Sequence, residues 1–246
     1  MLSKKDCILA INEWEVVRKN YSSIATMLDP KSVFCFNLDA LNWFTEKSSN
    51  DFFHAYFGVF NNELTLIVVP IDESGVELNL PEYLTASLSR LTEEVVLEEY
   101  ISKTFLKATI SLESHISDIS ENTITYSPSI PYISISNAVT RIRSWLNQCL
   151  SWFQYECDTY NGERIFKTFE VYSASLTNCD LNTSKVYCFF GFNESNNLLI
   201  PDLIFVAVCE EPASGNQCDS SGRILSDYSK PCPPFCYNIS NYNVFK

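Results

Sequence analysis

The sequence predicts an α+β protein built by internal duplication. Two stretches rich in aromatic and β-branched residues, 52–70 and 187–209, are each typical of an antiparallel hairpin. Before each hairpin come a helical pattern carrying a tryptophan, a short apolar strand and a small helix. We therefore expect two copies of a helix–strand–small helix–antiparallel hairpin unit, with a helical linker between the copies.

The spacing of matching residues supports the duplication. Ser3 and Trp14 are separated along the chain by the same interval as Ser134 and Trp145. The end of the first hairpin strand also matches, because both copies carry a Phe-Gly pair there: 57–58 and 190–191. The alternative is two α+β segments that share only their pattern of elements.

In the first half, Ser3 with Asp6 three residues later is typical of a capping box. This pair predicts a helix from about Lys4 to Asn20, with an extension toward Leu28. The expected elements that follow are a short strand, a small helix and a hairpin turn: 33–36, 39–47 and 61–62.

The second half repeats this order. Ser134 begins a helix that carries Trp145, and Asn161-Gly162 is expected to form a turn. A short strand is expected at 165–169, and 171–177 takes the place of the small helix. The hairpin that closes this copy is expected to have a longer loop, from Asn193 to Asp202.

Residues 80–131 are predicted to be the linker. The apolar residues Tyr83, Leu84, Leu88 and Leu91 fit one helix, and those from Val95 to Ile110 fit a second. Residues 121–131 are rich in turn-forming residues, which makes them the best boundary. The predicted parts are a first α+β repeat, a helical linker with its loop, and a second α+β repeat with a tail rich in cysteine and proline: 1–79, 80–131 and 132–246.

Composition excludes several classes of partner. The net charge is −13, so nucleic acids and anionic membrane surfaces would be repelled. An acidic surface could instead attract a basic protein. No apolar run resembles a signal peptide or a membrane-spanning helix, so we expect a cytoplasmic protein in which the ten cysteines are reduced.

The residues that could carry chemistry form no known catalytic motif. His54 lies among aromatic residues and His115 beside carboxylates, and neither has a nucleophile nearby in the sequence. Acidic pairs end both hairpins: Asp72, Glu73, Glu210 and Glu211. Such carboxylates could transfer protons or bind a hard cation, although most charged residues at strand ends are simply solvated. The sequence therefore favours a protein without enzymatic activity or cofactor.

The C-terminal tail contains the cysteines considered as metal ligands: Cys218, Cys232 and Cys236. Three prolines near the last two make this segment rigid and extended. The three cysteines could hold a metal as thiolates or form a disulfide or redox pair. Their irregular spacing differs from that of zinc knuckles, and ordinary packing is the third interpretation.

Several short pieces together resemble a group of uncharacterised small bacterial proteins. The matching pieces are a tryptophan-bearing helix, a short strand, a Phe-Gly hairpin, a Gly-containing turn and a Pro-Cys-Pro-Pro-x-Cys tail: Ser134–Trp145, 165–169, 190–191, 221–222 and 231–236. The resemblance implies that the second half corresponds to a domain found alone, and that the first half is a divergent copy without the cysteine tail. It implies no activity.

Surplus aromatic surface on the first hairpin suggests how the protein functions. Its strands are apolar on both faces, and Phe52, Tyr56 and Phe60 share the face that could meet a partner. We expect a cytosolic interaction or regulatory module with a protein partner, and self-association is a further expectation. The alternatives are a metal-binding or thiol-redox protein that uses the C-terminal cysteines, and an enzyme of unfamiliar type that uses the hairpin-end carboxylates in a cleft between the repeats.

Overall fold

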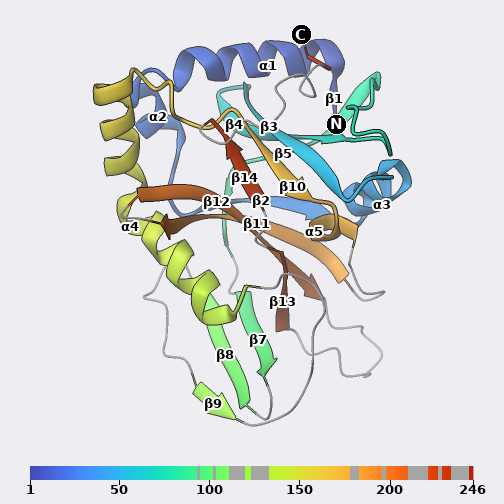
Figure 1. The fold of residues 1–246 in the computed structure, drawn as a ribbon, viewed down its shortest axis with the longest axis vertical. Coiled ribbons are helices and arrows are strands. Elements are labelled where there is room, and N and C mark those ends of the chain that lie inside the picture. The colour runs from blue at the N-terminus through green and yellow to red at the C-terminus, as the bar shows by residue number, and fades with distance from the viewer. Residues whose placement is uncertain are drawn as a thin grey trace.

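Two β-sheets form the centre of this α+β protein (Figure 1). The computed structural model describes residues 1–92, 95–101, 104–110, 120–122, 133–177, 183–195, 198–209, 221–226, 229–233 and 244–245. The first sheet has the strand order β1 (Leu2–Ser3), β5 (Glu82–Ser87), β4 (Glu63–Pro70), β3 (Phe52–Phe60), β10 (Thr168–Tyr172) and β14 (Ser229–Cys232). The second has the order β6 (Ser89–Arg90), β2 (Ser32–Asn37), β11 (Thr183–Ser195), β12 (Leu198–Cys209), β13 (Ser221–Ser226), β7 (Val95–Ile101), β8 (Thr104–Ile110) and β9 (Ser120–Asn122).

The helices of the described residues are α1 (Lys4–Val17), α2 (Tyr21–Met27), α3 (Leu38–Lys47), α4 (Ile135–Tyr160) and α5 (Ala174–Thr177). Ser3 caps α1 as predicted, since its hydroxyl oxygen accepts a hydrogen bond from the Asp6 N–H at 3.2 Å. The predicted helix to Asn20 is divided, however. α1 ends at Val17, and Asn20 begins α2 by accepting a hydrogen bond from the Ser23 N–H at 3.0 Å.

The predicted start and end of α4 are confirmed by its two caps. The Ser134 hydroxyl oxygen accepts from the Asn137 N–H at 3.2 Å. At the other end, Asn161 (φ 52°) and Gly162 (φ 70°) adopt the left-handed conformation that turns the chain out of the helix.

The first hairpin, β3–β4, is also confirmed. Asn61 and Asn62 both have positive φ (52° and 65°), which matches the right-handed twist of the strands that they join. The second hairpin, β11–β12, differs from the prediction of a loop from Asn193 to Asp202. Residues 193–195 and 198–202 continue the paired strands instead, with Asn193 opposite Ile200 and Gly191 opposite Asp202.

The predicted helical linker is wrong. Residues 82–87, 89–90, 95–101, 104–110 and 120–122 form strands, and β5 pairs with β4 along Thr65–Val68. Tyr83 and Leu84 are adjacent and both buried, because β5 is covered on both faces. A strand buried on both faces shows no alternation of apolar and polar residues, so its apolar residues can also be fitted to a helix.

Each sheet combines strands from both halves of the chain. In the first sheet β10 pairs with β3, and Phe169 lies opposite Ala55. In the second sheet β2 pairs with β11, and Phe34 lies opposite Cys188. Each half therefore contributes its short strand to the sheet that contains the other half's hairpin. The short strand predicted at 165–169 forms three residues later, as β10.

The core lies between the two sheets and is largely aromatic. Phe57 of the first sheet has its ring centroid 6.0 Å from that of Phe34 and 5.8 Å from that of Phe190, both in the second sheet. Phe166 fills the space beside them, 4.7 Å from Phe57. Each such side chain contributes about 1.5–3 kcal/mol through burial, so this contact strongly favours the two sheets packing together.

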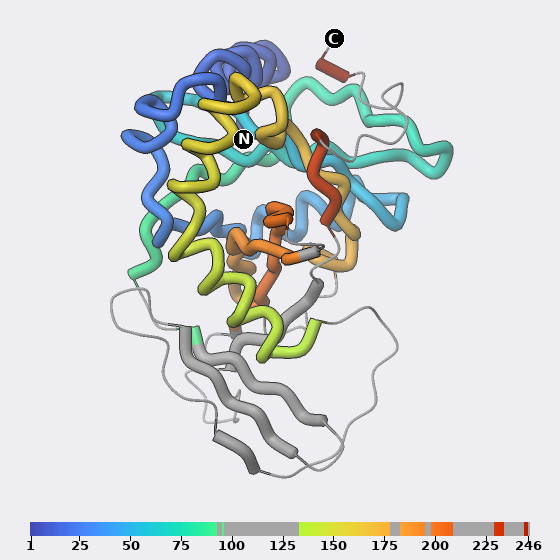
Figure 2. Tube along the Cα trace, turned by 60° about the vertical axis from the view of Figure 1, so that its left-hand side comes forward, coloured from blue at the N-terminus to red at the C-terminus, as the bar shows by residue number. Residues whose placement is uncertain are grey.

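One long helix covers the outer face of each sheet (Figures 1 and 2). Cys7 and Ala10 of α1 pack on outward-facing residues of the first sheet, and Ala138 and Ile142 of α4 pack on those of the second. The tryptophans lie further along the same helices. Trp14 donates its indole N–H to the Phe166 carbonyl at 2.9 Å, and Trp145 stacks on Phe190 at 4.4 Å.

Candidate functional site

A cluster of side chains on the outer face of the first sheet packs against the C-terminal end of the described chain. Figure 1 shows the C-terminus beside α1, at the end where β1 enters it. Val244 and Phe245, the terminal segment, pack there against a cluster from α1 and the sheet. We call this site the tyrosine groove and define it by Tyr56, Ile67, Val69, Glu77 and Tyr83.

Strand geometry gives the tyrosine groove its apolar floor. Side chains alternate between the two faces of a strand, so Ile67 and Val69 of β4 point outward together. Tyr56 of β3 lies opposite Ile67, and Tyr83 of β5 completes the row. The inward-facing neighbours are apolar as well, and they belong to the core between the sheets.

Glu77 is the polar centre of the tyrosine groove. One carboxylate oxygen, Oε1, accepts the Tyr56 hydroxyl at 2.6 Å and lies 2.6 Å from His54 Nδ1. The other, Oε2, accepts the main-chain N–H of Val244 at 2.8 Å. The Glu77 side chain is only 1% exposed, so hydrogen bonds from the protein replace its contacts with water.

These hydrogen bonds determine the charge of Glu77. Burial raises the pKa of this carboxyl, but the hydrogen bonds from His54, Tyr56 and the Val244 N–H outweigh burial, and the pKa lies below its ordinary value. Glu77 is therefore an ionised acceptor near neutral pH. His54 Nδ1 carries the proton that faces it, and this sets the orientation of the imidazole ring.

A tight turn places Glu77 in the groove. Asp72 Oδ1 accepts hydrogen bonds from the Ser74 N–H, the Ser74 hydroxyl and the Val76 N–H, at 2.9, 2.6 and 2.9 Å. The Ser74 hydroxyl is the main cause of the lowered pKa of Asp72. Asp72 was predicted as a possible acid–base or cation-binding residue, and the structure gives it a role in shaping this turn.

Two tyrosines hold the aromatic ring of Phe245. The ring centroid lies 5.2 Å from Tyr56 and 5.0 Å from Tyr83, at 88° and 67°, which are edge-to-face arrangements. Tyr83 is fixed in turn, since its hydroxyl donates to the Leu78 carbonyl and accepts the Leu80 N–H, both at 3.0 Å. Val244 is also buried, with 7% exposed.

The groove lacks the features of a hydrolytic site. The thiol near it, Cys7, has a pKa raised to about 12, because burial disfavours the thiolate. Both oxygens of the Glu77 carboxylate already accept hydrogen bonds from the protein, so this group is poorly placed to take a proton from a substrate as a general base. The arrangement is instead suited to holding an extended chain by one main-chain N–H and two apolar side chains.

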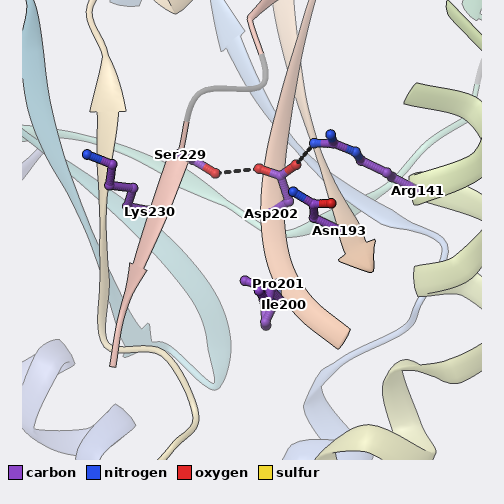
Figure 3. A pocket seen from close by; sticks show the side chains of 7 residues that line it. All are labelled: Arg141, Asn193, Ile200, Pro201, Asp202, Ser229 and Lys230. Carbon is purple, nitrogen blue, oxygen red and sulfur yellow. Dashed lines mark hydrogen bonds and ion pairs between the residues drawn. The ribbon is translucent and has the colours of Figure 1, made fainter. Parts of the chain in front are cut away.

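A second candidate site is a small cavity of about 200 Å³ beside α4 (Figure 3). Arg141 of α4 pairs with Asp202 of β12 at 2.5 Å, and the other Asp202 oxygen accepts the Ser229 hydroxyl at 2.7 Å. Asn193, Ile200, Pro201 and Lys230 form the remaining walls. Asp202 is almost buried and joins α4, β12 and β14, so its contacts position these elements relative to each other.

The predicted aromatic surface is largely covered. Tyr56 lies under Phe245, with 8% exposed. Phe52 is partly buried and packs edge-on against Tyr172 of β10 at 5.7 Å, and Phe60 is partly buried beside α1's cluster. Tyr56 and Phe60 thus belong to the cluster that holds the terminal segment, whereas Phe52 packs on Tyr172.

The other predicted carboxylates do not meet Asp72 in the described part of the chain. Glu73 is exposed beside Asp72. Glu210 and Glu211 lie outside the described residues, as does His115. A chemical role for these carboxylates in a cleft between the repeats stays a prediction.

Cys232 is disulfide-bonded, which differs from the expectation that all ten cysteines are reduced. The thiols of Cys7, Cys149, Cys157 and Cys188 are free. Cys218 and Cys236, predicted with Cys232 as metal ligands, lie outside the described residues. Among the residues that are described, no group of three or more His, Cys, Asp or Glu side chains could hold a metal ion.

None of the described helices is long and apolar enough to span a membrane. Comparison of the chain with protein-family models, curated proteins and solved structures gave no match. The resemblance to small bacterial proteins therefore stays a prediction, and the functional hypothesis rests on the residues of the groove.

Proposed function

We propose that this protein is a cytosolic, non-enzymatic protein-interaction module whose binding surface is the tyrosine groove. The proposal rests on one observation: the chain's own terminal segment, Val244 and Phe245, is bound in this groove. A buried carboxylate accepts its main-chain N–H, and two tyrosine rings enclose its aromatic side chain. Main-chain hydrogen bonds give affinity for an extended segment, and adjacent side-chain sites give specificity.

We also propose that the two halves arose by duplication, which would explain where the groove lies. Gly58 of the first hairpin lies under Ala10 of α1, and Gly191 of the second lies under Arg141 of α4. Ala10 and Arg141 are separated by the same interval as Trp14 and Trp145. In this view each hairpin presents one outer face to its own helix, at the glycine that ends its Phe-Gly pair.

A thiol-redox role is the second candidate, because Cys232 is disulfide-bonded. Cys232 is only 7% exposed, however, and disulfide exchange requires access for an attacking thiolate. A structural bond is therefore the better interpretation. Titration of thiols in the native protein before and after mild reduction distinguishes the two: a redox pair gains thiols readily, whereas a structural disulfide resists.

The proposed function can be tested by selecting peptides from a random display library on the intact chain. We expect selected peptides to bind the intact chain and to lose at least about tenfold in affinity against Tyr83→Ala, which removes one wall of the groove. Leu9→Ala is the control, because Leu9 is 58% exposed on α1 and lies outside the groove. Circular dichroism verifies that both variants are folded.

Two outcomes would remove the proposal. One is that no peptide is enriched on the intact chain. The other is that the enriched peptides bind Tyr83→Ala and Leu9→Ala equally well, which would place the binding surface elsewhere.

A further inference from the structure

We infer that the tyrosine groove recognises an aliphatic residue followed by an aromatic residue in a protein partner, and that the chain's own Val244–Phe245 competes for this site. The inference rests on the proposed function and specifies the partner's chemistry and its regulation. The seated terminal segment is the direct evidence for what the groove accepts.

The contacts define the chemistry at each position. The first residue must have a main-chain N–H, because Glu77 Oε2 accepts that of Val244 at 2.8 Å, and this excludes proline. Its side chain is aliphatic, since Val244 is buried among apolar residues. The second residue is aromatic, because Tyr56 and Tyr83 meet the Phe245 ring edge-to-face.

Charge adds a preference for a basic partner. Glu77 is ionised in the groove, and the whole chain carries a net charge of −13. A lysine, Lys246, follows Phe245 in the chain's own sequence. A partner segment with basic residues near its aliphatic–aromatic pair would therefore be attracted to the surface before it docks.

The terminal segment is a small occupant, which makes it a competitor that a partner can displace. Its described contacts consist of one main-chain hydrogen bond and two side chains on the groove. Because it belongs to the same chain, it competes at a high effective concentration, typically on the order of millimolar. A partner must then bind more strongly, or be present at higher concentration, than it would need for an empty groove.

The test uses a fluorescent synthetic peptide with the sequence of residues 241–246 and the full-length chain. Val244→Ser combined with Phe245→Ser weakens the internal occupant and leaves the groove residues intact. Fluorescence anisotropy is expected to show that the peptide binds this double variant at least about tenfold more tightly than it binds the intact chain. Phe245→Leu alone is the milder variant if the double variant is unstable.

Two controls locate the binding. Adding Glu77→Gln to the double variant is expected to weaken peptide binding about tenfold, since the charged acceptor is lost. Glu82→Gln, an exposed position on β5 of the same sheet, is expected to leave binding unchanged. A peptide with proline in place of the valine is expected not to bind.

Several results would overturn the inference. The first is that the peptide binds no variant. The second is that it binds the intact chain and the double variant equally well. The third is that Glu77→Gln leaves its binding unchanged. A dimer of the intact chain that dissociates on Phe245→Ser, seen by light scattering, would make a second copy the occupant and also overturn it. If library peptides still bind through Tyr83 in these cases, the proposed function stands and only this inference is lost.

Discussion

Gly58 lies directly beneath Ala10, at the point where α1 crosses β3. A Cβ atom at position 58 would be 2.8 Å from the Ala10 Cβ and 3.0 Å from the Ala10 carbonyl carbon. The absence of a side chain at Gly58 thus lets the helix approach the first sheet closely enough to form one wall of the cluster that holds the terminal segment.

Gly58→Ala should therefore push α1 away from the sheet. Overpacking of this kind costs about 1–3 kcal/mol, because the atoms in the way belong to the helix backbone and to Ala10. Gly191→Ala is the matched control. A Cβ atom at position 191 would lie 2.9 Å from the flexible end of the Ile204 side chain, so we expect a smaller fall in the free energy of unfolding. Urea unfolding measures both, and equal losses would contradict this explanation of Gly58.

Arg18 joins the end of α1 to the turn after α4. Its guanidinium is fully buried and donates to the carbonyls of Gly162 and Ile165, the latter at 3.1 Å. Arg18→Met keeps most of the volume but leaves both carbonyls without this donor, so we expect a loss of about 2–4 kcal/mol in the free energy of unfolding. Lys19→Met removes only a half-exposed pair with Glu163 and should cost less than about 1 kcal/mol.

The Arg18 prediction is checked by urea unfolding followed by circular dichroism. Equal effects of the two substitutions would mean that the buried guanidinium does not stabilise the junction between the helices.

Asp202 makes the analogous connection at the Figure 3 cavity. Asp202→Asn retains the shape of the side chain but removes the charge that faces Arg141, which is 2.5 Å away and partly exposed. We expect the free energy of unfolding to fall by about 1–3 kcal/mol. This loss is smaller than for a fully buried ion pair, because water can solvate Arg141. Lys230→Ala breaks a partly exposed pair with Glu170 at 3.4 Å and should change the free energy of unfolding by less than about 1 kcal/mol. Thermal unfolding of the two variants compares their stabilities. If Lys230→Ala destabilises the protein as much as Asp202→Asn does, the Arg141–Asp202 pair is no more important than the Lys230–Glu170 pair.

Local signals in the sequence predicted the local structure well. Ser3 and Ser134 begin helices because a side-chain oxygen at that position accepts a main-chain N–H three residues later. Asn61 and Asn62 form the turn because asparagine tolerates positive φ. In each case the physical cause lies within a few residues, so it can be read without the fold.

The features that depend on long-range contacts could not be predicted in this way. Tyr83 and Leu84 were assigned to a helix, since a strand covered on both faces has no distinctive periodicity. Glu77 carries no local signal either. It becomes a buried acceptor because His54, Tyr56 and, far along the chain, Val244 place hydrogen-bond donors against it. The joining of strands from the two halves in one sheet likewise depends on pairing between distant segments.

The ionisation of Glu77 predicts how stability changes with pH. The carboxylate is hydrogen-bonded by His54, Tyr56 and the Val244 N–H, so its pKa in the folded protein lies below its ordinary value of 4.5. A depressed folded-state pKa adds stability that is present in full above the ordinary value. This stability is lost as the pH falls through the folded-state pKa. Glu77→Gln is expected to cost about 1–3 kcal/mol at pH 7, because charge-assisted hydrogen bonds are lost.

The difference in unfolding free energy between the intact chain and Glu77→Gln should then stay constant from pH 7 to about 4.5 and narrow below 4.5, since protonation there removes the same charge from the intact chain. Urea unfolding across this range measures the gap. Glu82→Gln on the exposed side of β5 is the control and should follow the intact chain at every pH. A gap between the intact chain and Glu77→Gln that stays constant down to pH 3.5 would show that the Glu77 charge does not hold the terminal segment in the groove.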